Sequence, residues 1–229
     1  MLIDFNIPGV SFFGAPLPFD SQLENRFSHL LPPSMANVAQ VRKQEFIAGR
    51  YCAIQAAKLV GLELAKVPTA KTREPVWPEG IVGSITHSKL LAISCVSLSQ
   101  HWSSIGIDAE ELIDPALKAD IESLVASPVE LKYLRSLDSP IGLTVLFSGK
   151  EALYKALFPL VRTFIDFKEV KLTNLDADMK LFELELISSN ESLAGHVGRY
   201  QGSFKQFGET IVTVVSIPRP MREGSHVDS

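Results

Sequence analysis

Residues 139–159 read SPIGLTVLFSGKEALYKALFP. Ser139 followed by Pro140 has the form of an N-cap and a proline at the first helical position, which is a common start of a helix. From there to Pro159 the apolar side chains recur at steps of three and four, as on one face of an amphipathic helix. They are Leu143, Leu146, Phe147, Leu153, Tyr154 and Leu157. The stretch therefore predicts a long helix with one buried face.

The chain around this helix is divided by proline and glycine into shorter segments. Helical spacing predicts a second long helix from Asn37 to Gly61. Short strands and turns are expected up to Pro33, a loop at 68–80, and two weaker helices between 114 and 137. Segments rich in Ile, Val and Leu, or alternating apolar and polar residues, are expected to be strands. They are 81–85, 90–98, 104–107, 169–175, 180–187, 199–207 and 209–217.

Each half of the chain thus has one long helix and several strands, a rhythm that predicts an α+β fold of two similar lobes. We place the N-terminal lobe at residues 1–112 and the C-terminal lobe at 113–217. Residues 218–229 show no apolar periodicity and are expected to form a flexible tail. With 229 residues, 46% of them apolar, the chain is long enough for one large core or two smaller ones.

The composition argues against several classes of protein. There are 22 Lys and Arg residues against 26 Asp and Glu, a net charge of −4, which disfavours a general nucleic-acid-binding surface. Cys52 and Cys95 have no CxxC spacing, so a disulfide framework is not expected. Asp4 stands where a signal peptide needs basic residues, and no apolar run approaches ~18 residues. We expect a cytoplasmic protein without a membrane span.

Two motifs carry carboxylates. In Gly106-Ile107-Asp108-Ala109-Glu110, residues two apart on a strand point to the same side, so Asp108 and Glu110 can present two carboxylates to one point. The alternative is a polar strand end that faces water. On the long helix Glu151 and Lys155 are four residues apart, and the alternative there is a surface ion pair worth only ~0.2–0.5 kcal/mol.

Basic side chains come from other elements. Thr86 and His87 end a predicted strand with a hydroxyl and an imidazole, although a single histidine at a strand end is more often simply exposed. Arg42 and Arg50 lie on the predicted helix at 37–61, and Arg73 lies in the loop after it. Together with three carboxylates, these groups suggest a magnesium-assisted phosphate site, because Mg²⁺ prefers oxygen ligands.

These motifs resemble those of the 4'-phosphopantetheinyl transferases of the surfactin and enterobactin-synthase type. The hallmark of that family is a GIDxE strand followed about forty residues later by a helix of the form FSxKExxxKxL. This chain reads GIDAE at 106–110 and FSGKEALYKAL at 147–157. The resemblance spans roughly residues 40–175, and Thr86 stands where serine is commoner in the family. Further matching segments are RKQEFIAGR at 42–50, PVWP at 75–78, GSITHS at 83–88, PLV at 159–161 and FIDF at 164–167.

The resemblance implies a holo-carrier-protein synthase with two pseudo-symmetric lobes and its active site at their junction. Such enzymes transfer the 4'-phosphopantetheine arm of coenzyme A to a serine of an apo acyl, peptidyl or aryl carrier protein and release adenosine 3',5'-bisphosphate. By resemblance, Asp108, Glu110 and Glu151 would hold Mg²⁺ against the coenzyme pyrophosphate. Glu151 would also be the general base. Lys155, assisted by Lys150, would bind the pyrophosphate and stabilise the leaving phosphate.

The other coenzyme contacts are carried over from the family in the same way. Thr86 and His87 would bind a coenzyme phosphate. Arg42, Arg50 and Arg73 would bind near its 3'-phosphate and adenine ends, since a guanidinium suits a phosphate dianion. We expect the protein to act as a monomer.

Two alternatives stay open at this point. One is another magnesium-dependent coenzyme A or nucleotide phosphoryl-transfer enzyme that has no carrier-protein substrate. The other is a non-catalytic coenzyme-binding or scaffold protein, against which the intact carboxylates and Lys155 argue. The carrier is open as well, because siderophore, polyketide and fatty-acid carriers all fit the sequence.

We expect the carrier to dock mainly through apolar contacts. The chain has a net negative charge and no long Lys/Arg run that would attract an acidic partner. Segment 114–137 supplies more apolar residues than one narrow buried stripe requires, and the alternative is that all of them pack between the lobes. They are Leu117, Ile121, Leu124, Val125, Leu131 and Leu134.

Overall fold

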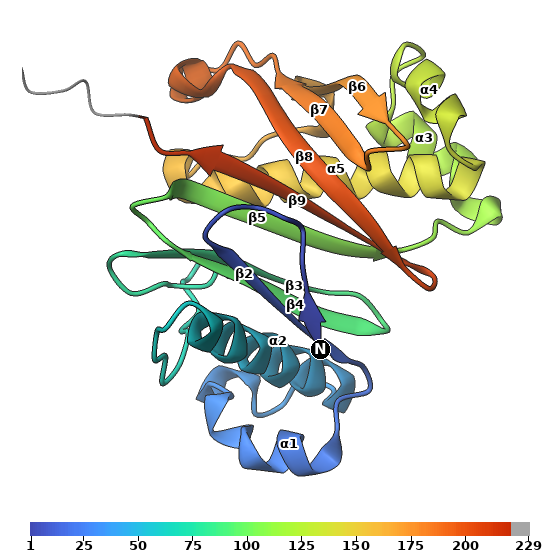
Figure 1. Cartoon of the computed structure of the whole chain (residues 1–229). Coiled ribbons are helices and arrows are strands. Elements are labelled where there is room, and N and C mark those ends of the chain that lie inside the picture. Colours follow the sequence, from blue (N-terminus) through green and yellow to red (C-terminus); the bar gives the residue numbers. More distant parts are fainter. Residues whose placement is uncertain (221–229) are drawn as a thin grey trace, which may run out of the picture.

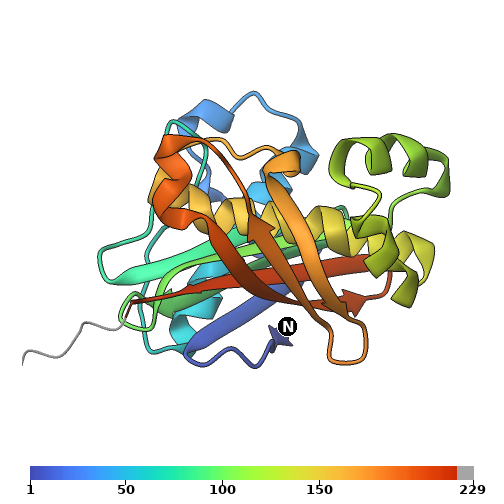
Figure 2. The same ribbon diagram turned by 90° about the horizontal axis from the view of Figure 1, so that it is seen from above.

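The computed structural model describes residues 1–220, and residues 221–229 of the expected tail lie outside the described residues. Two antiparallel sheets pack face to face, and each carries one long helix on its outer side (Figures 1 and 2). The strand order is β1-β2-β4-β3 in one sheet and β5-β9-β8-β7-β6 in the other. This architecture confirms the predicted α+β fold of two lobes.

The elements follow the chain in this order. The strands are β1 (Leu2–Ile3), β2 (Val10–Pro16), β3 (Ile81–His87), β4 (Leu91–Leu98), β5 (Trp102–Glu111), β6 (Val170–Asp176), β7 (Leu181–Leu186), β8 (Gly198–Phe207) and β9 (Thr210–Pro218). The α-helices are α1 (Ser21–Arg26), α2 (Gln40–Leu59), α3 (Lys118–Val125), α4 (Glu130–Tyr133) and α5 (Ser139–Val161). Short 3-10 helices lie at Ser28–Leu30, Pro33–Met35, Pro115–Leu117, Leu134–Ser136, Phe167–Glu169 and Glu191–His196.

Helix α2 lies close to the four-stranded sheet because its inner face is built from small residues. Ala48, Cys52 and Ala56 on this face are fully buried. At Gly49 a Cβ atom would come within 2.8 Å of the Ile85 side chain of β3. The small side chains therefore set the short distance between α2 and β3.

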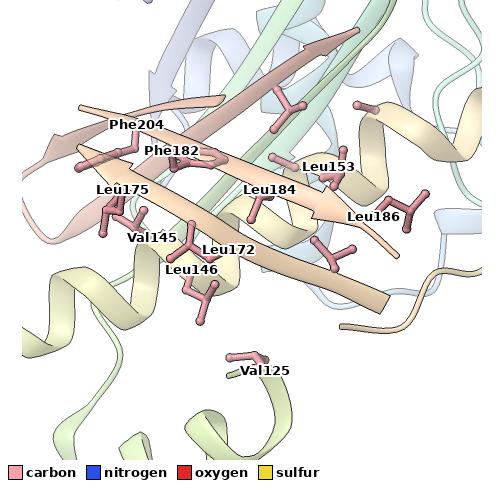
Figure 3. Close-up of a cluster of buried hydrophobic side chains, with 14 of the residues drawn as sticks. Val125, Val145, Leu146, Leu153, Leu172, Leu175, Phe182, Leu184, Leu186 and Phe204 are labelled. Carbon is pink, nitrogen blue, oxygen red and sulfur yellow. The ribbon is translucent and has the colours of Figure 1, made fainter. Parts of the chain in front are cut away.

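Helix α5 approaches the five-stranded sheet even more closely. A Cβ atom at Gly106 of β5 would overlap the backbone of Ala152 and Ala156, so the helix rests directly on this strand. Gly106 is thus required by a close approach rather than by its own backbone angles. The hydrophobic core around α5 and strands β6 to β8 is shown in Figure 3.

The two sheets share an apolar layer between them. Phe12 and Ile93 of the four-stranded sheet pack in one cluster with Ile107, Val212 and Val214 of the five-stranded sheet. Along β5 the members of this cluster are Ile105, Ile107 and Ala109. They alternate with Gly106, Asp108 and Glu110, which therefore lie on the α5 side of the strand. The polar face of the motif is directed away from the shared core.

Strand β5 joins the sheet formed by the later part of the chain. It lies within residues 1–112, yet it pairs with β9 from Trp102↔Pro218 to Glu111↔Thr210. The change from one sheet to the other therefore falls between β4 and β5. The lobe boundary at residue 112 stays a prediction.

Three details differ from the sequence expectations. Residues before Pro33 include the short helix α1, whose N-cap Asp20 accepts hydrogen bonds from two backbone amides. Helix α5 has its N-cap at Asp138, one residue earlier than predicted. It also continues past Pro159 to Val161, because a proline near the end of a helix removes only one backbone hydrogen bond while its φ stays helical. In the described part of the chain, no helix is both long and apolar enough to cross a membrane.

Candidate active site

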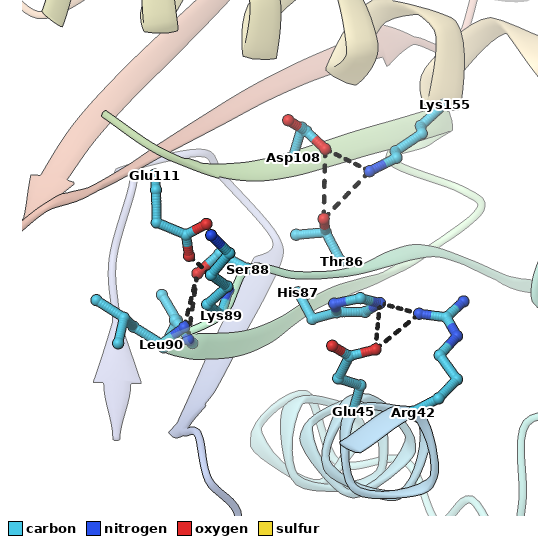
Figure 4. Close-up of polar contacts among 11 residues, drawn as sticks. Arg42, Glu45, Thr86, His87, Ser88, Lys89, Leu90, Asp108, Glu111 and Lys155 are labelled. Carbon is cyan, nitrogen blue, oxygen red and sulfur yellow. Dashed lines mark hydrogen bonds and ion pairs between the residues drawn. The ribbon is translucent and has the colours of Figure 1, made fainter. Parts of the chain in front are cut away.

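Asp108 of β5 is the centre of a polar cluster between the two lobes (Figure 4). Its carboxylate is 2% exposed. Oδ1 accepts a hydrogen bond from Lys155 Nζ of α5 at 2.5 Å and one from Thr86 Oγ1 of β3 at 3.3 Å. Lys155 Nζ also donates to Thr86 Oγ1 at 3.1 Å. The structure thus brings together three predicted site residues from three different elements.

The other carboxylate oxygen of Asp108 has partners that the sequence analysis did not single out. Ser148 Oγ of α5 donates to Oδ2 at 2.8 Å and lies 2.8 Å from Thr213 Oγ1 of β9. Ser148 and Lys155 are seven residues apart, so they share one face of the helix, and that spacing was a usable signal. Thr213 is the cross-strand partner of Asp108 and belongs to no motif, so the sequence offered no signal for it.

Glu110 and Glu151 lie in the same electrostatic environment as Asp108. Burial, followed by the negative charge of Asp108, raises the pKa of Glu110 to about 7. The same two causes raise the pKa of Glu151. In both cases Lys155 acts in the opposite direction. The three carboxylates therefore share one electrostatic field, and added positive charge would favour their ionised forms.

A metal ion is expected at these carboxylates, and their chemistry fits a hard divalent cation because all the donors are oxygen atoms. Among residues 1–220, however, no group of three or more His, Cys, Asp or Glu side chains has an arrangement that could hold a metal ion. In this structure the positive charge beside Asp108 Oδ1 is the Lys155 ammonium. Asp108, Glu110 and Glu151 are thus close enough to interact but do not form a closed cage.

A second polar group lies where β3 ends against the first part of α2 (Figure 4). Arg42 Nη1 lies 2.5 Å from His87 Nε2 and 2.9 Å from Glu45 Oε2. A guanidinium can only donate, so His87 Nε2 accepts and the imidazole is neutral here. Burial lowers the pKa of His87, Glu45 raises it, and Arg42 and Lys155 lower it further. Glu45 was not among the predicted residues; its position three residues after Arg42 on α2 was the available signal.

The other two predicted arginines have different surroundings. Arg50 is 7% exposed; its Nε donates to Val67 O at 3.0 Å and its Nη2 to Thr69 Oγ1 at 2.7 Å. Burial and the charge of Arg42 lower the pKa of Arg50 to about 10. Arg50 thus ties the start of the loop at 68–80 to α2. Arg73 is exposed in that loop and has a positive φ of 76°.

Lys150 points away from this site, although it precedes Glu151 in the chain. Its ammonium lies 2.8 Å from Glu130 Oε1 and donates to the carbonyl oxygens of Val125 at 2.7 Å and Phe167 at 3.1 Å. Glu130 also accepts from the backbone of Leu172. All three Lys150 donors are used inside the C-terminal lobe, so the predicted contact of Lys150 with the coenzyme is not retained.

The apolar residues of segment 114–137 divide into two sets. Val125 and Leu134 are buried in the C-terminal core, and Ile121 and Leu131 pack against it. Leu117 and Leu124 are exposed, at 53% and 63%. Leu124 borders a pocket of about 250 Å³ between α3, α5 and β6. Part of the segment thus belongs to the core of the C-terminal lobe and part of it faces outward, so the alternative that all six residues pack between the lobes is wrong.

The chain is similar to proteins of one family over most of its length. Residues 31–97 match the family model described as the 4'-phosphopantetheinyl transferase N-terminal domain, and residues 104–207 match the 4'-phosphopantetheinyl transferase superfamily. The 4'-phosphopantetheinyl transferase Npt of Nocardia iowensis is 32% identical over 157 residues, which are 68% of each chain. The 4'-phosphopantetheinyl transferase Svp of Streptomyces mobaraensis is 29% identical over 88% of this chain and 84% of its own. Enterobactin synthase component D of Salmonella typhi is 29% identical over 80% of this chain and 75% of its own.

Proposed function

Because this chain belongs to the 4'-phosphopantetheinyl transferase superfamily, we propose that it transfers the 4'-phosphopantetheine arm of coenzyme A to a serine of an apo carrier protein, with Mg²⁺ bound and with release of adenosine 3',5'-bisphosphate. Membership of the family establishes the enzyme class and the use of coenzyme A and carrier proteins in general. The observation that carries the finer proposal is the contact of Lys155 with Asp108 and Thr86 beside two further carboxylates.

In this proposal Asp108, Glu110 and Glu151 would hold Mg²⁺, and their side chains would have to move together to do so, because they do not form a three-ligand site in the described part of this structure. When bound, this ion would neutralise charge on the pyrophosphate of the coenzyme. Lys155 already neutralises Asp108 and is 29% exposed on its side chain, so its ammonium can reach a phosphate oxygen while it stays near the carboxylates. We therefore assign two roles to Lys155: it binds the pyrophosphate of the coenzyme and stabilises the phosphate of the leaving group.

Glu151 is our candidate for the general base. Its raised pKa makes it a stronger proton acceptor than an ordinary glutamate. In the reaction the serine oxygen attacks the phosphorus next to the pantetheine arm, and the bond from that phosphorus to adenosine 3',5'-bisphosphate breaks. Glu151 takes the serine proton in this step.

His87 and Arg42 are our candidates for the 3'-phosphate of coenzyme A. A phosphate dianion would replace the Glu45 carboxylate as the acceptor for Arg42, and its charge would favour protonation of the His87 imidazole, which is neutral in this structure, so that His87 would donate to it as well. Thr86 precedes His87 on β3 and contacts Asp108 of β5, so one extended ligand can contact both the Arg42–His87 group and the carboxylates. Arg50 supports the loop at 68–80, and Arg73 in that loop is kept as a candidate for the adenine end.

For the carrier protein we propose a docking surface on α3 and the turn before it, centred on Leu117 and Leu124. Both side chains are apolar and exposed on consecutive short helices, so a partner that covers them would bury apolar surface. The cytoplasmic location and the monomeric state stay predictions. Free, buried cysteines at positions 52 and 95 are compatible with the former.

The test is mass spectrometry of a panel of apo carrier proteins incubated with coenzyme A and Mg²⁺. We expect a mass gain of one phosphopantetheine on at least one carrier, and none on a carrier whose modified serine is replaced by alanine. Loss of coenzyme A without any mass gain would favour the alternative, a phosphoryl-transfer enzyme that has no carrier substrate.

A further inference from the structure

The two buried hydroxyls beside Asp108 form a directed chain. Ser148 has one hydroxyl proton and donates it to Asp108 Oδ2 at 2.8 Å. Thr213 Oγ1 lies 2.8 Å from Ser148 Oγ, and because the Ser148 proton is already used, Thr213 must be the donor in this contact. The order is therefore Thr213 to Ser148 to Asp108.

This chain of hydrogen bonds is buried and therefore shielded from water. Ser148 and Thr213 are completely buried, and Asp108 is nearly so. Water therefore does not replace a lost hydroxyl, and the carboxylate depends on Ser148 for a partner on Oδ2. A carboxylate held at Oδ2 cannot rotate freely about its Cβ–Cγ bond. Its other oxygen, Oδ1, is thereby kept toward Lys155 and Thr86.

We propose that Thr213 and Ser148 are positioning residues that orient Asp108, with Ser148 acting directly and Thr213 acting through Ser148. This inference rests on the proposed function, in which Asp108 is one of the residues that would hold the cation. A merely structural role would be to satisfy a buried carboxylate in folding. The two roles differ in what they predict for ligand binding by the folded protein.

The experiment uses Mn²⁺ alone as the probe, titrated into chelator-treated protein and followed by electron paramagnetic resonance of the free ion. Ser148→Ala should weaken Mn²⁺ binding about tenfold, the size expected for loss of a hydrogen bond to a charged group. Thr213→Val, which keeps the side-chain shape, should weaken it about threefold. In the double variant, Thr213→Val should add nothing to Ser148→Ala, because the Thr213 effect passes through Ser148.

Two variants serve as controls. Thr210→Val removes another buried hydroxyl of β9, which lies 3.5 Å from Ser88 Oγ and does not contact Asp108, so it should leave Mn²⁺ binding unchanged. Ser148→Thr keeps the hydroxyl and should restore most of the affinity. Effects of Ser148→Ala and Thr213→Val that multiply, or wild-type affinity in Ser148→Ala, would overturn the proposal.

The wild-type protein, the two single variants and the double variant form a double-mutant cycle, and all four are also unfolded in urea without metal. The relay predicts that the two substitutions are not additive in the free energy of unfolding either. If the wild-type protein binds no Mn²⁺, the cation site of the proposed function is wrong and the positioning role that rests on it is rejected with it, while this second cycle still tests the hydrogen-bond order from Thr213 through Ser148 to Asp108. Additive unfolding effects would then reject it.

Discussion

Helix α5 contributes a lysine to each of two lysine–carboxylate pairs, and the two pairs differ in what surrounds them. Lys150 and Glu130 are 2% and 4% exposed on their side chains, and protein atoms accept from Lys150 in three directions. Lys155 and Asp108 are 29% and 3% exposed, and Glu110 and Glu151 lie nearby with raised pKa values. The first pair is closed and the second is open on the lysine side.

The difference indicates how a structural pair and a catalytic pair can be separated on one helix. A closed pair has no capacity left for a ligand, so its effect is on stability and on the position of α3, whose last residue Val125 is held by Lys150. An open pair retains a donor and unsatisfied negative charge for a ligand. The following predictions test this distinction, beginning with the largest expected effect.

Glu151→Gln should lower the rate of transfer by about 10²–10⁴-fold, because it removes the proposed proton acceptor while keeping the side-chain size. The midpoint of thermal unfolding should change little. Steady-state transfer to an apo carrier measures the first, and calorimetry the second. Glu185→Gln is the matched control, because it makes the same change at a glutamate of β7 that pairs with the exposed Arg199. A near-normal rate for Glu151→Gln would assign the base to another group.

Lys150→Met should lower the free energy of unfolding by about 3–5 kcal/mol, because it leaves Glu130 buried without its charged partner. Lys155→Met should cost clearly less, since solvent screens the exposed end of that pair. Urea unfolding measures both. Transfer per folded molecule should follow the reverse order, with the greater loss in Lys155→Met. Equal stability losses would contradict the distinction between a closed and an open pair.

Coenzyme A should bind more tightly than dephospho-coenzyme A by about 10- to 100-fold, because the 3'-phosphate would accept hydrogen bonds from the Arg42 guanidinium and from a His87 imidazole that its charge would protonate. His87→Ala and Arg42→Ala should each reduce this preference. The control is His101→Ala, which alters an exposed histidine outside the site. Isothermal titration with both ligands measures the ratio. If the wild-type protein does not distinguish them, the assignment of His87 and Arg42 is wrong.

Leu124→Asp should raise the KM for the carrier about tenfold and leave the affinity for coenzyme A unchanged, because the substitution places a charge on the proposed docking surface. This surface includes α3, whose last residue Val125 accepts a hydrogen bond from Lys150. Met179→Asp is the matched control, since Met179 is also apolar and exposed but lies between β6 and β7. The same rise in both variants would show that added charge, rather than this surface, is responsible.

Glu110→Gln should have the smallest effect: it should change the free energy of unfolding by about 1 kcal/mol after allowance for solvent screening. Glu110 has its pKa raised to about 7 when folded, from the ordinary value of 4.5. Between these pH values the folded chain binds more protons than the unfolded chain. The stability contributed by this group is therefore complete below pH 4.5 and is lost as the pH rises to 7. In metal-free protein, the unfolding free energy of wild type relative to Glu110→Gln should fall across that range. A constant difference would mean that Glu110 ionises as it does in water.

The sequence by itself determined the two long helices, the strands from β3 to β9 and the core of the site. Apolar spacing identified α2 and α5, because a helical period is a local property that packing preserves. The step of two residues from Asp108 to Glu110 placed both on one face of β5, since side chains alternate along any strand. The motifs also identified the family, which the comparisons confirm.

Only the tertiary structure decided which neighbours those residues have. Lys150 and Glu151 are adjacent in sequence but about 100° apart around the helix, and packing alone determines that one turns to Glu130 and the other toward the carboxylates. Thr213 reaches Ser148 across 65 residues because β9 pairs with β5, and Glu45 meets His87 because α2 covers β3. Contacts of this kind depend on the three-dimensional path of the chain, and no local pattern encodes them.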